Sequence, residues 1–352
     1  MTSTFTLEPL YPYSQRDNLL ALAREHAAAV DAGERSPFET LRELGQEGLL
    51  TLGRTGSVLP QAAVAFDLAT EDTATAFSLW AHRATIAFFD AVGRQLPEGM
   101  ETGETTGSTA MAAAFKHASG VGELGVQAKH TDGGLLLNGS ISWASNLYPG
   151  GVMILPVAVE DAAPGEPVSY IVTLRVGVEG LDVKYQKGLL ALDATESGFI
   201  RLTEVFVPES DILSRDVPGF LATITAPFLL IQSSFCLGLA AAALAATAPH
   251  TSVSRGIFTQ EFDQFKAEYQ RLRTELTDLA QEPAATSRRR LLQLRLDVSH
   301  LAISATHLEM AVIGGRGYKT TSATARRYRE ATFLPVQSPT EGHLRYELSQ
   351  ID

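Results

Sequence analysis

Ile313-Gly314-Gly315-Arg316-Gly317-Tyr318 is the stretch that decides the fold, together with Arg329-Glu330-Ala331 and Gln337-Ser338-Pro339-Thr340, which follow it. We expect a helix to run into the clustered glycines, because glycine lets a helix end in a left-handed conformation and lets another backbone or a ligand come close. A short second helix is expected beyond Lys319, and the Ser-Pro pair predicts a turn after it.

The order and spacing of these segments resemble the C-terminal signature of the acyl-CoA dehydrogenase superfamily, which reads roughly G-G-x-G-Y, R-D-A and E-G-T. Thr340 matches the threonine of E-G-T, whereas Ser338 stands where the family carries its catalytic glutamate. The resemblance implies an α+β fold with an N-terminal helical domain, a middle β-barrel domain and a C-terminal domain of the four-helix-bundle type.

Length, charge and cysteine content restrict the class of protein. The chain has 352 residues, 45% of them hydrophobic, and can bury a substantial core in two or three packed subdomains. Its net charge of −12 and pI near 5.2 argue against nucleic acid or an anionic membrane as partners, since both attract basic surfaces. The single cysteine, Cys236, cannot form an internal disulfide, and the N-terminus lacks the pattern of a signal peptide, so we expect a cytoplasmic location.

Helical patterns occupy the first part of the chain. Apolar spacing predicts a helix over residues 17–32 and a second helix after Pro37. Residues 60–96 supply two more apolar helices. Residues 97–107 form a Gly/Glu/Thr linker without apolar periodicity, so the first domain is expected to span residues 1–107.

Short alternating patterns broken by Gly, Asp and Pro fill residues 108–215 and predict a small β-barrel or sandwich as the second domain. Helical patterns return over residues 216–352 and predict a helical bundle as the third domain. Its most apolar stretch, residues 226–248, is long enough to span a bilayer, but its alanines and polar residues indicate a buried helix of a soluble bundle.

A second segment carries the family resemblance. Residues 137–146, Leu-Asn-Gly-Ser-Ile-Ser-Trp-Ala-Ser-Asn, resemble the LNGxKxWxTN segment of the family. In relatives, the tryptophan packs on the flavin ring and the hydroxyl two residues later bonds the flavin N5 edge, so the resemblance implies these roles for Trp143 and Ser145. Period-two spacing places both on one face of a strand, where they can meet one planar ligand. The alternative is a core tryptophan and a strand-end serine.

The segment from Arg255 to Phe258 is similar to the RxxF element of the family. The resemblance implies that Arg255 binds the pyrophosphate of flavin adenine dinucleotide (FAD) held by a neighbouring subunit, and that Phe258 packs near the adenine. Arginine suits this task because its planar fork can bind phosphate oxygens in a bidentate manner. Gly314, Gly315 and Thr340 would contact the same dinucleotide, which implies a homodimer or homotetramer. The alternative is a solvated arginine beside a core phenylalanine.

Three positions depart from the family pattern. Phe115 stands where relatives carry a flavin-binding threonine, Ala311 replaces a glutamine, and Ser338 replaces the glutamate that removes the substrate α-proton. Serine is too weak a base unless another group activates it. Residues 226–248, where some relatives place the glutamate, contain no Asp or Glu. Weaker flavin binding, a different flavin and a vestigial site all remain open.

His82 suggests a second kind of chemistry. Monooxygenases of the same fold lack the glutamate, use reduced flavin with oxygen, and often place a histidine near the reacting flavin carbon; His82 is similar to it in position. We therefore name Ser338 and His82 as candidate catalytic residues. The ordinary interpretation of His82 is a hydrogen-bonded histidine on a packed helix face. No metal-binding motif occurs in the sequence.

Despite these departures from the family pattern, the resemblance implies an FAD-dependent oxidoreductase that acts on an acyl thioester or a related small molecule. Acyl-CoA or an acyl carrier protein would be the partner, and the arginine run 288–290 is a candidate surface for their phosphates or else a solvated face. One alternative is a monooxygenase that receives reduced FMN or FAD from a reductase. Another is a scaffold that has lost flavin, which would explain Phe115, Ala311 and Ser338 together.

Overall fold

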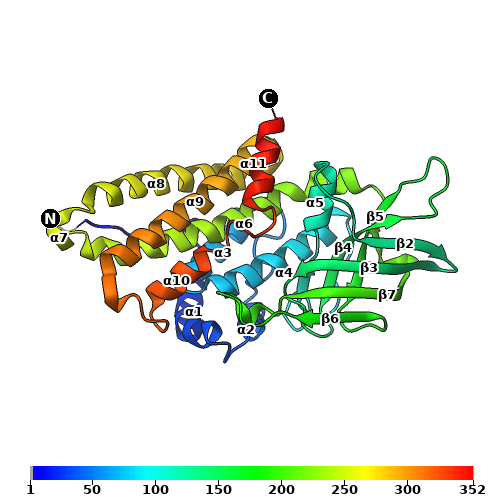
Figure 1. Ribbon diagram of the computed structural model, residues 1–352, viewed down its shortest axis with the longest axis horizontal. Helices are drawn as coiled ribbons and strands as arrows, with labels where there is room; N and C mark the ends of the chain where they lie inside the picture. The colour runs from blue at the N-terminus through cyan, green and yellow to red at the C-terminus, as the bar shows by residue number, and fades with distance from the viewer. Residues whose placement is uncertain (1–2, 352) are drawn as a thin grey trace. The chain divides into compact units, whose positions relative to one another are not determined.

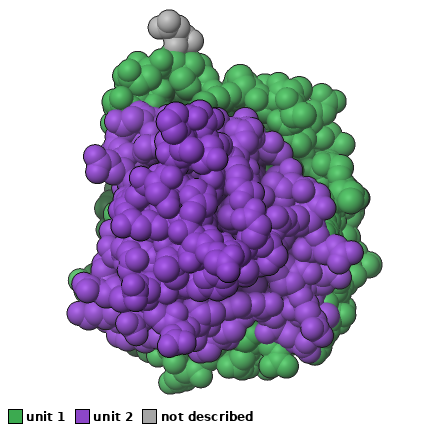
Figure 2. Space-filling view, turned by 90° about the vertical axis from the view of Figure 1, so that its right-hand side faces the viewer, with its two compact units in different colours: residues 1–80, 190–194, 226–352 green, residues 81–189, 195–225 purple. Residues whose placement is uncertain are grey.

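A computed structural model describes residues 3–351, apart from the side chain of Ser254. The chain divides into two compact units, which Figure 2 shows in separate colours. Unit 1 comprises residues 1–80, 190–194 and 226–352, and unit 2 comprises residues 81–189 and 195–225. The divisions at residues 80 and 225 fall inside two long helices, α4 (Thr73–Ala91) and α6 (Val217–Thr247).

Unit 1 is helical. Besides its parts of α4 and α6, its helices are α1 (Arg16–Asp31), α2 (Pro37–Gln46), α3 (Leu59–Glu71), α7 (Val253–Gly256), α8 (Thr259–Gln281), α9 (Arg288–Ile313), α10 (Ala323–Ala331) and α11 (Glu341–Gln350). Helices α8 and α9 run alongside each other, and α10 and α11 pack on α9 (Figure 1). The helices expected after Pro37 and over residues 17–32 and 60–96 are confirmed.

Polar side chains fix where several of these helices begin. Ser36 Oγ accepts a hydrogen bond from the backbone N–H two residues on, and Pro37 occupies the first turn of α2, where an N–H would lack a helical partner anyway. Ser287, Ser322 and Thr340 also cap α9, α10 and α11, each accepting a hydrogen bond from the backbone N–H three residues on. Each cap satisfies a terminal N–H and thereby helps to fix where the helix starts.

Helix α6 is the most apolar element. Residues 217–250, which include α6, are long and apolar enough to cross a membrane by length and composition, yet 94% of their most apolar window is buried within the protein. Burial of this extent is typical of a core helix, as the alanines and polar residues of this stretch predict. Cys236 lies in this helix and is fully buried.

Unit 2 holds one eight-stranded sheet. Its strands are β1 (Gly107–Thr109), β2 (Val126–Thr131), β3 (Gly134–Ala144), β4 (Val152–Val159), β5 (Ser169–Arg175), β6 (Leu181–Tyr185), β7 (Gly198–Pro208) and β8 (Ile212–Ser214). They pair in the order β6-β7-β3-β2-β4-β5-β8, and β1 pairs with β4. Side chains from β2 to β8 share one buried apolar cluster, so the sheet curves around its own core, as in the expected barrel-type domain.

The antiparallel pairing of β3 with β7 extends from Gly134 opposite Pro208 to Ala144 opposite Gly198, with irregularities in register after Leu137 and after Ile141. The parallel pairs are β1 with β4 and β2 with β4. The helix α5 (Ala112–Ala118) and the strands β1, β6 and β8 were not predicted. Each has seven residues or fewer, too short for a periodic pattern to stand out.

Candidate functional site

The end of strand β3 carries the first group of predicted site residues. Trp143 is 43% exposed, whereas the other tryptophan, Trp80, is buried. The register irregularity after Ile141 leaves both Ser142 and Trp143 exposed, and the strand ends one residue before Ser145. The expected placement of Trp143 and Ser145 on one face of the strand therefore does not hold. Ser145 is buried, whereas the indole of Trp143 is exposed. The indole of Trp143 remains an exposed aromatic face that a planar ligand can cover.

Ser145 belongs to a chain of buried hydroxyl groups in unit 2. Its Oγ lies 2.6 Å from Ser197 Oγ, which lies 2.9 Å from Thr195 Oγ1. Ser108 Oγ donates to the carbonyl of Ser145 at 2.6 Å, and the N–H of Asn146 donates to the carbonyl of Thr195 at 2.9 Å. These bonds hold the end of β3 against residues 195–197, so the hydroxyl of Ser145 is already occupied within the protein.

His82 is fully buried in α4 and uses both ring nitrogens. Nδ1 accepts a hydrogen bond from the N–H of Gly107 at 3.0 Å, so the ring proton lies on Nε2, which donates to the carbonyl of Met100 at 2.9 Å. Burial is the main cause that lowers its pKa to about 4, and the ring is neutral at neutral pH. His82 thus ties the segment before β1 to α4, which is its ordinary interpretation.

In unit 1, Arg255 lies in the short helix α7. Its side chain is exposed and makes no hydrogen bond or ion pair within the part of the chain that the structure describes. Its backbone φ of 61° is a left-handed conformation that non-glycine residues adopt rarely and that often marks functional positions. Phe258 is half-buried and directly precedes α8. Arg255 is therefore a cation available to a ligand.

The glycine segment ends α9 as expected. Gly314 adopts a φ of 67°, and a Cβ added at Gly314 or Gly315 would meet no atom within 4 Å, so both backbones face open space. Arg316 Nη2 lies 3.2 Å from His250 Nε2, which places this segment beside the turn that precedes α7. The structure therefore brings the segments of Arg255 and of the glycines together at one end of unit 1 (Figure 1).

Thr340 and Ser338 lie in the turn before α11. Thr340 Oγ1 accepts from the N–H of His343 at 3.3 Å and caps the helix. The carbonyl of Ser338 accepts from Gln232 Nε2 at 2.9 Å, while its Oγ is buried without a hydrogen-bond partner among residues 3–351. A serine hydroxyl needs a neighbouring base to act in proton transfer, and no carboxylate hydrogen-bonds the Ser338 hydroxyl among these residues.

The arginine run at the start of α9 is engaged within the chain. Arg288 pairs with Glu347, Arg290 Nε lies 3.5 Å from Glu275, and Arg289 donates to the carbonyl of Ile351. Glu347 also lies 2.9 Å from Nε2 of His343. The run therefore links α9 to α8 and α11, and it remains only partly available to a phosphate group.

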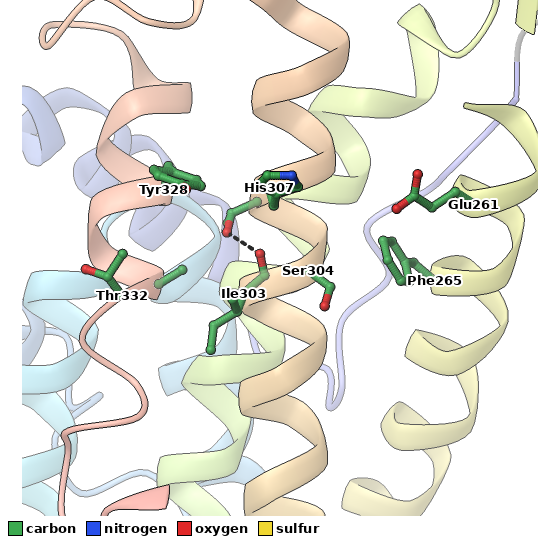
Figure 3. Close-up of a pocket in the computed structure, with 9 residues that line it drawn as sticks. Glu261, Phe265, Ile303, Ser304, His307, Tyr328 and Thr332 are labelled. Atoms are coloured by element: carbon green, nitrogen blue, oxygen red, sulfur yellow. Dashed lines mark hydrogen bonds between the residues drawn. The ribbon is translucent and has the colours of Figure 1, made fainter. Parts of the chain in front are cut away.

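A cavity of about 270 Å³ opens elsewhere on unit 1, between α8, α9 and α10 (Figure 3). Its lining comprises Glu261, Phe265, Ile303, Ser304, Thr306, His307, Tyr328, Ala331 and Thr332. The ring centroids of His307 and Tyr328, which both line the cavity, lie 6.3 Å apart. None of the predicted site residues lines this cavity.

Several buried charged residues were not predicted from the sequence, and Arg295 and Glu330 are two of them. Arg295 is fully buried on α9, and Glu330 is fully buried on α10 with its pKa raised by burial to about 7. The signal for Arg295 was present, because it occupies an apolar position of the pattern formed by Leu291, Leu294 and Val298. Phe115 is buried in α5, so its ring is part of the core. Among the described residues, no cluster of metal-ligating side chains occurs.

Comparison with known proteins identifies the fold. No protein-family profile and no curated protein matches the sequence. Solved structures match over nearly the whole chain, and we name three. A glutaryl-coenzyme A dehydrogenase in complex with glutaryl-CoA has a TM-score of 0.81 and 19% identity, covering 98% of this chain and 95% of its own.

The second is the glutaryl-CoA dehydrogenase of Mycobacterium smegmatis in complex with FADH2, with a TM-score of 0.80, 14% identity and coverage of 97% and 95%. The third is the flavoprotein nitroalkane oxidase, with a TM-score of 0.77, 15% identity and coverage of 97% for both chains. At these identities the likeness establishes the fold. The chain has the acyl-CoA dehydrogenase-like fold, which confirms the fold class expected from its sequence.

Proposed function

We propose that this protein is a flavin-dependent oxidoreductase that acts on an acyl thioester or a related small molecule. The observation that carries the proposal is the exposed indole of Trp143 at the end of β3, in a fold shared with the flavoproteins named above. Exposing a large aromatic face to water is unfavourable, so such a face is a candidate binding surface for a planar ring.

The residues present fit FAD in part. Trp143 would stack on the flavin ring of one FAD, and the exposed Arg255 with the open backbones of Gly314 and Gly315 would hold the pyrophosphate of an FAD bound to a second copy of the chain. Phe258 would pack near the adenine. Thr340 already caps α11 and Ser145 already bonds Ser197, so each would contribute mainly by shaping the backbone near it. When bound, the flavin supplies hydride or electron transfer.

The reaction is constrained by what surrounds Ser338. Gln232 bonds the carbonyl of Ser338, Gln337 precedes it in the chain, and the cation Arg295 bonds both glutamines. None of these three side chains can remove a proton from a substrate carbon. This favours, as a second candidate, a monooxygenase that takes reduced FMN or FAD from a reductase. His82 would not be its flavin-facing histidine, since both ring nitrogens bond the backbone.

We also propose that the protein forms a homo-oligomer. Val253, Ile257 and Tyr318 are exposed on the two neighbouring segments that carry Arg255 and the glycines. Exposed apolar side chains beside a cation support a contact with a second copy, as a homodimer or homotetramer would make. We also propose a cytoplasmic location, which a chain with one cysteine, and therefore without an internal disulfide, supports.

Anaerobic mixing with short acyl-CoA thioesters distinguishes the two reactions, once the protein has been loaded with FAD. Loss of the oxidised-flavin absorbance without oxygen identifies a dehydrogenase. Turnover that requires a reductase and oxygen identifies a monooxygenase. If neither reaction is observed and the protein also fails to bind flavin, the result would indicate a non-catalytic scaffold.

A further inference from the structure

A cation without a counter-charge lies in the core of unit 1. The Arg295 side chain is fully buried, and a guanidinium stays charged in proteins. It donates from Nε to Gln232 Oε1 at 2.8 Å, and from Nη2 to the carbonyl of Leu334 and to Gln337 Oε1, both at 3.2 Å. All three acceptors are neutral, and Arg295 forms no ion pair or hydrogen bond with a carboxylate among residues 3–351.

Unused polar atoms occur on Arg295 itself and on two residues of its hydrogen-bond network. Arg295 Nη1, Gln337 Nε2 and Ser338 Oγ are buried and have no hydrogen-bond partner among the described residues. They belong to one connected network, because Gln232 bonds Arg295 through its oxygen and the carbonyl of Ser338 through its nitrogen. Nη1 and Nε2 carry only N–H donors, and the hydroxyl can also donate.

The chemistry of a fitting ligand follows from these atoms. Burying an unpaired charge carries a large desolvation cost, which a negative partner offsets. Unsatisfied N–H and O–H donors require acceptor atoms. A carboxylate supplies both, because it is negative and its two oxygens accept hydrogen bonds from several donors.

We infer that Arg295, Gln337 and Ser338 form a binding site for a small carboxylate. The carboxylate pairs with the guanidinium at Nη1 and accepts from the amide of Gln337 and the hydroxyl of Ser338. Two sources share this chemistry: a carboxylate group of the substrate and a free small carboxylate that stays bound. The inference does not depend on flavin chemistry.

Thermal unfolding of the full-length protein tests the site, with sodium formate and sodium acetate as probes. The salt replaces sodium chloride stepwise, so that ionic strength stays constant. A ligand that binds only the folded state should raise the Tm by about 2 °C for each tenfold increase in concentration above its Kd, for a chain of this length. Arg295→Met, of similar length and without charge, should abolish the rise.

Arg290→Met is the matched control, since it removes the same charge from the same helix at an exposed position. It should respond to formate as the wild type does. Should Arg295→Met not fold, Ser338→Glu serves instead. This variant supplies the carboxylate covalently, so it should unfold at a higher temperature than the wild type in chloride and should gain nothing from formate.

The two sources are separated by analysing what purified protein releases on acid denaturation. A stoichiometric small carboxylate identifies a resident ion, and release of none with reversible formate binding identifies a position for a substrate carboxylate; both support the site. Three results would overturn it. The first is that neither probe raises the Tm and no carboxylate is released. The second is that formate raises the Tm of Arg295→Met as much as that of the wild type. The third is that formate raises the Tm of Ser338→Glu as much as that of the wild type.

Discussion

His82 Nδ1 accepts a hydrogen bond from the backbone N–H of Gly107 at 3.0 Å, across 25 residues of sequence. A Cβ at Gly107 would lie 2.6 Å from Cβ of Thr85, so only glycine allows the segment to approach α4 this closely. Histidine and glycine together set where β1 starts. The feature that looked like a catalytic histidine in the sequence is a structural link within unit 2.

The first prediction concerns acid stability. Because the pKa of His82 is lowered to about 4 in the folded protein, its contribution to stability is fully present above about pH 6.5 and is lost as pH falls toward 4. The loss should reach about 3 kcal/mol. Urea unfolding at pH 7 and pH 5 should show this dependence in the wild type. His82→Gln should be less stable at pH 7 and should lack this part of the slope; an unchanged slope would contradict the assignment.

The second prediction concerns Gly107. Gly107→Ala should destabilise the protein by about 1–3 kcal/mol, because the added methyl group overpacks against Thr85. The denaturant midpoint measures the change. Gly150→Ala is not a clean control, since Gly150 has a φ of 79°. Gly342→Ala is a suitable control, because Gly342 lies within α11 and a Cβ there meets nothing within 4 Å. If Gly342→Ala lost as much stability as Gly107→Ala, the result would refute the close approach of Gly107 to Thr85.

The third prediction has the opposite pH sign. Burial, opposed by Arg326 at 3.9 Å, raises the pKa of Glu330 to about 7. The stability it contributes is therefore present below about pH 4.5 and is lost as pH rises through 7. Glu330→Gln should remove this decline, so that the free energy of unfolding falls less between pH 5 and pH 8 than in the wild type. Equal declines in both proteins would contradict a buried, protonated Glu330.

The fourth prediction uses the two tryptophans. Trp143 is exposed and Trp80 is buried, with its Nε1 donating to the carbonyl of Phe228 at 3.0 Å. Flavin that stacks on Trp143 should quench its fluorescence. Trp143→Leu should weaken FAD binding about tenfold, since an aromatic stacking contact, which leucine cannot make, contributes roughly 0.5–1.5 kcal/mol beyond its buried area. Retention of full affinity in Trp143→Leu would exclude Trp143 from the flavin site.

The fifth prediction separates the dinucleotide from the flavin ring. Arg255→Gln should lower affinity for FAD about tenfold or more, because a charge-assisted bond to phosphate is lost, and should leave riboflavin affinity unchanged. Equilibrium dialysis measures both ligands. Arg345→Gln, which removes an exposed arginine bonded to Glu341, is the control and should bind FAD normally. An equal loss for FAD and riboflavin would mean that Arg255 supports the fold instead.

Much of the fold was predictable because its elements are long and strongly patterned. Helices α6 and α9 each carry apolar residues over 26 or more positions, and the glycines mark where α9 ends. The short elements were not predictable, since α5 and β1 hold too few residues for periodicity. The register irregularity beside Trp143 arises from pairing with β7, which the local sequence does not reveal.

The candidate site was predictable only in part. Sequence spacing identified Trp143, Arg255 and the glycines, whose exposure or openness suits a ligand. The same reasoning could not tell that the hydroxyl of Ser145 bonds Ser197, because these residues are 52 positions apart. Nor could it find the network of Arg295 with Gln232 and Gln337, which three distant segments form. Long-range hydrogen bonds decide which polar groups remain free.

The visible absorption spectrum of the purified protein tests the central claim most directly, after incubation with FAD and removal of the excess. We predict a protein-bound oxidised-flavin band in the wild type and a weaker band in Trp143→Leu and Arg255→Gln. A correctly folded, colourless protein that retains no flavin would contradict the assignment of Trp143 and Arg255 to an FAD site.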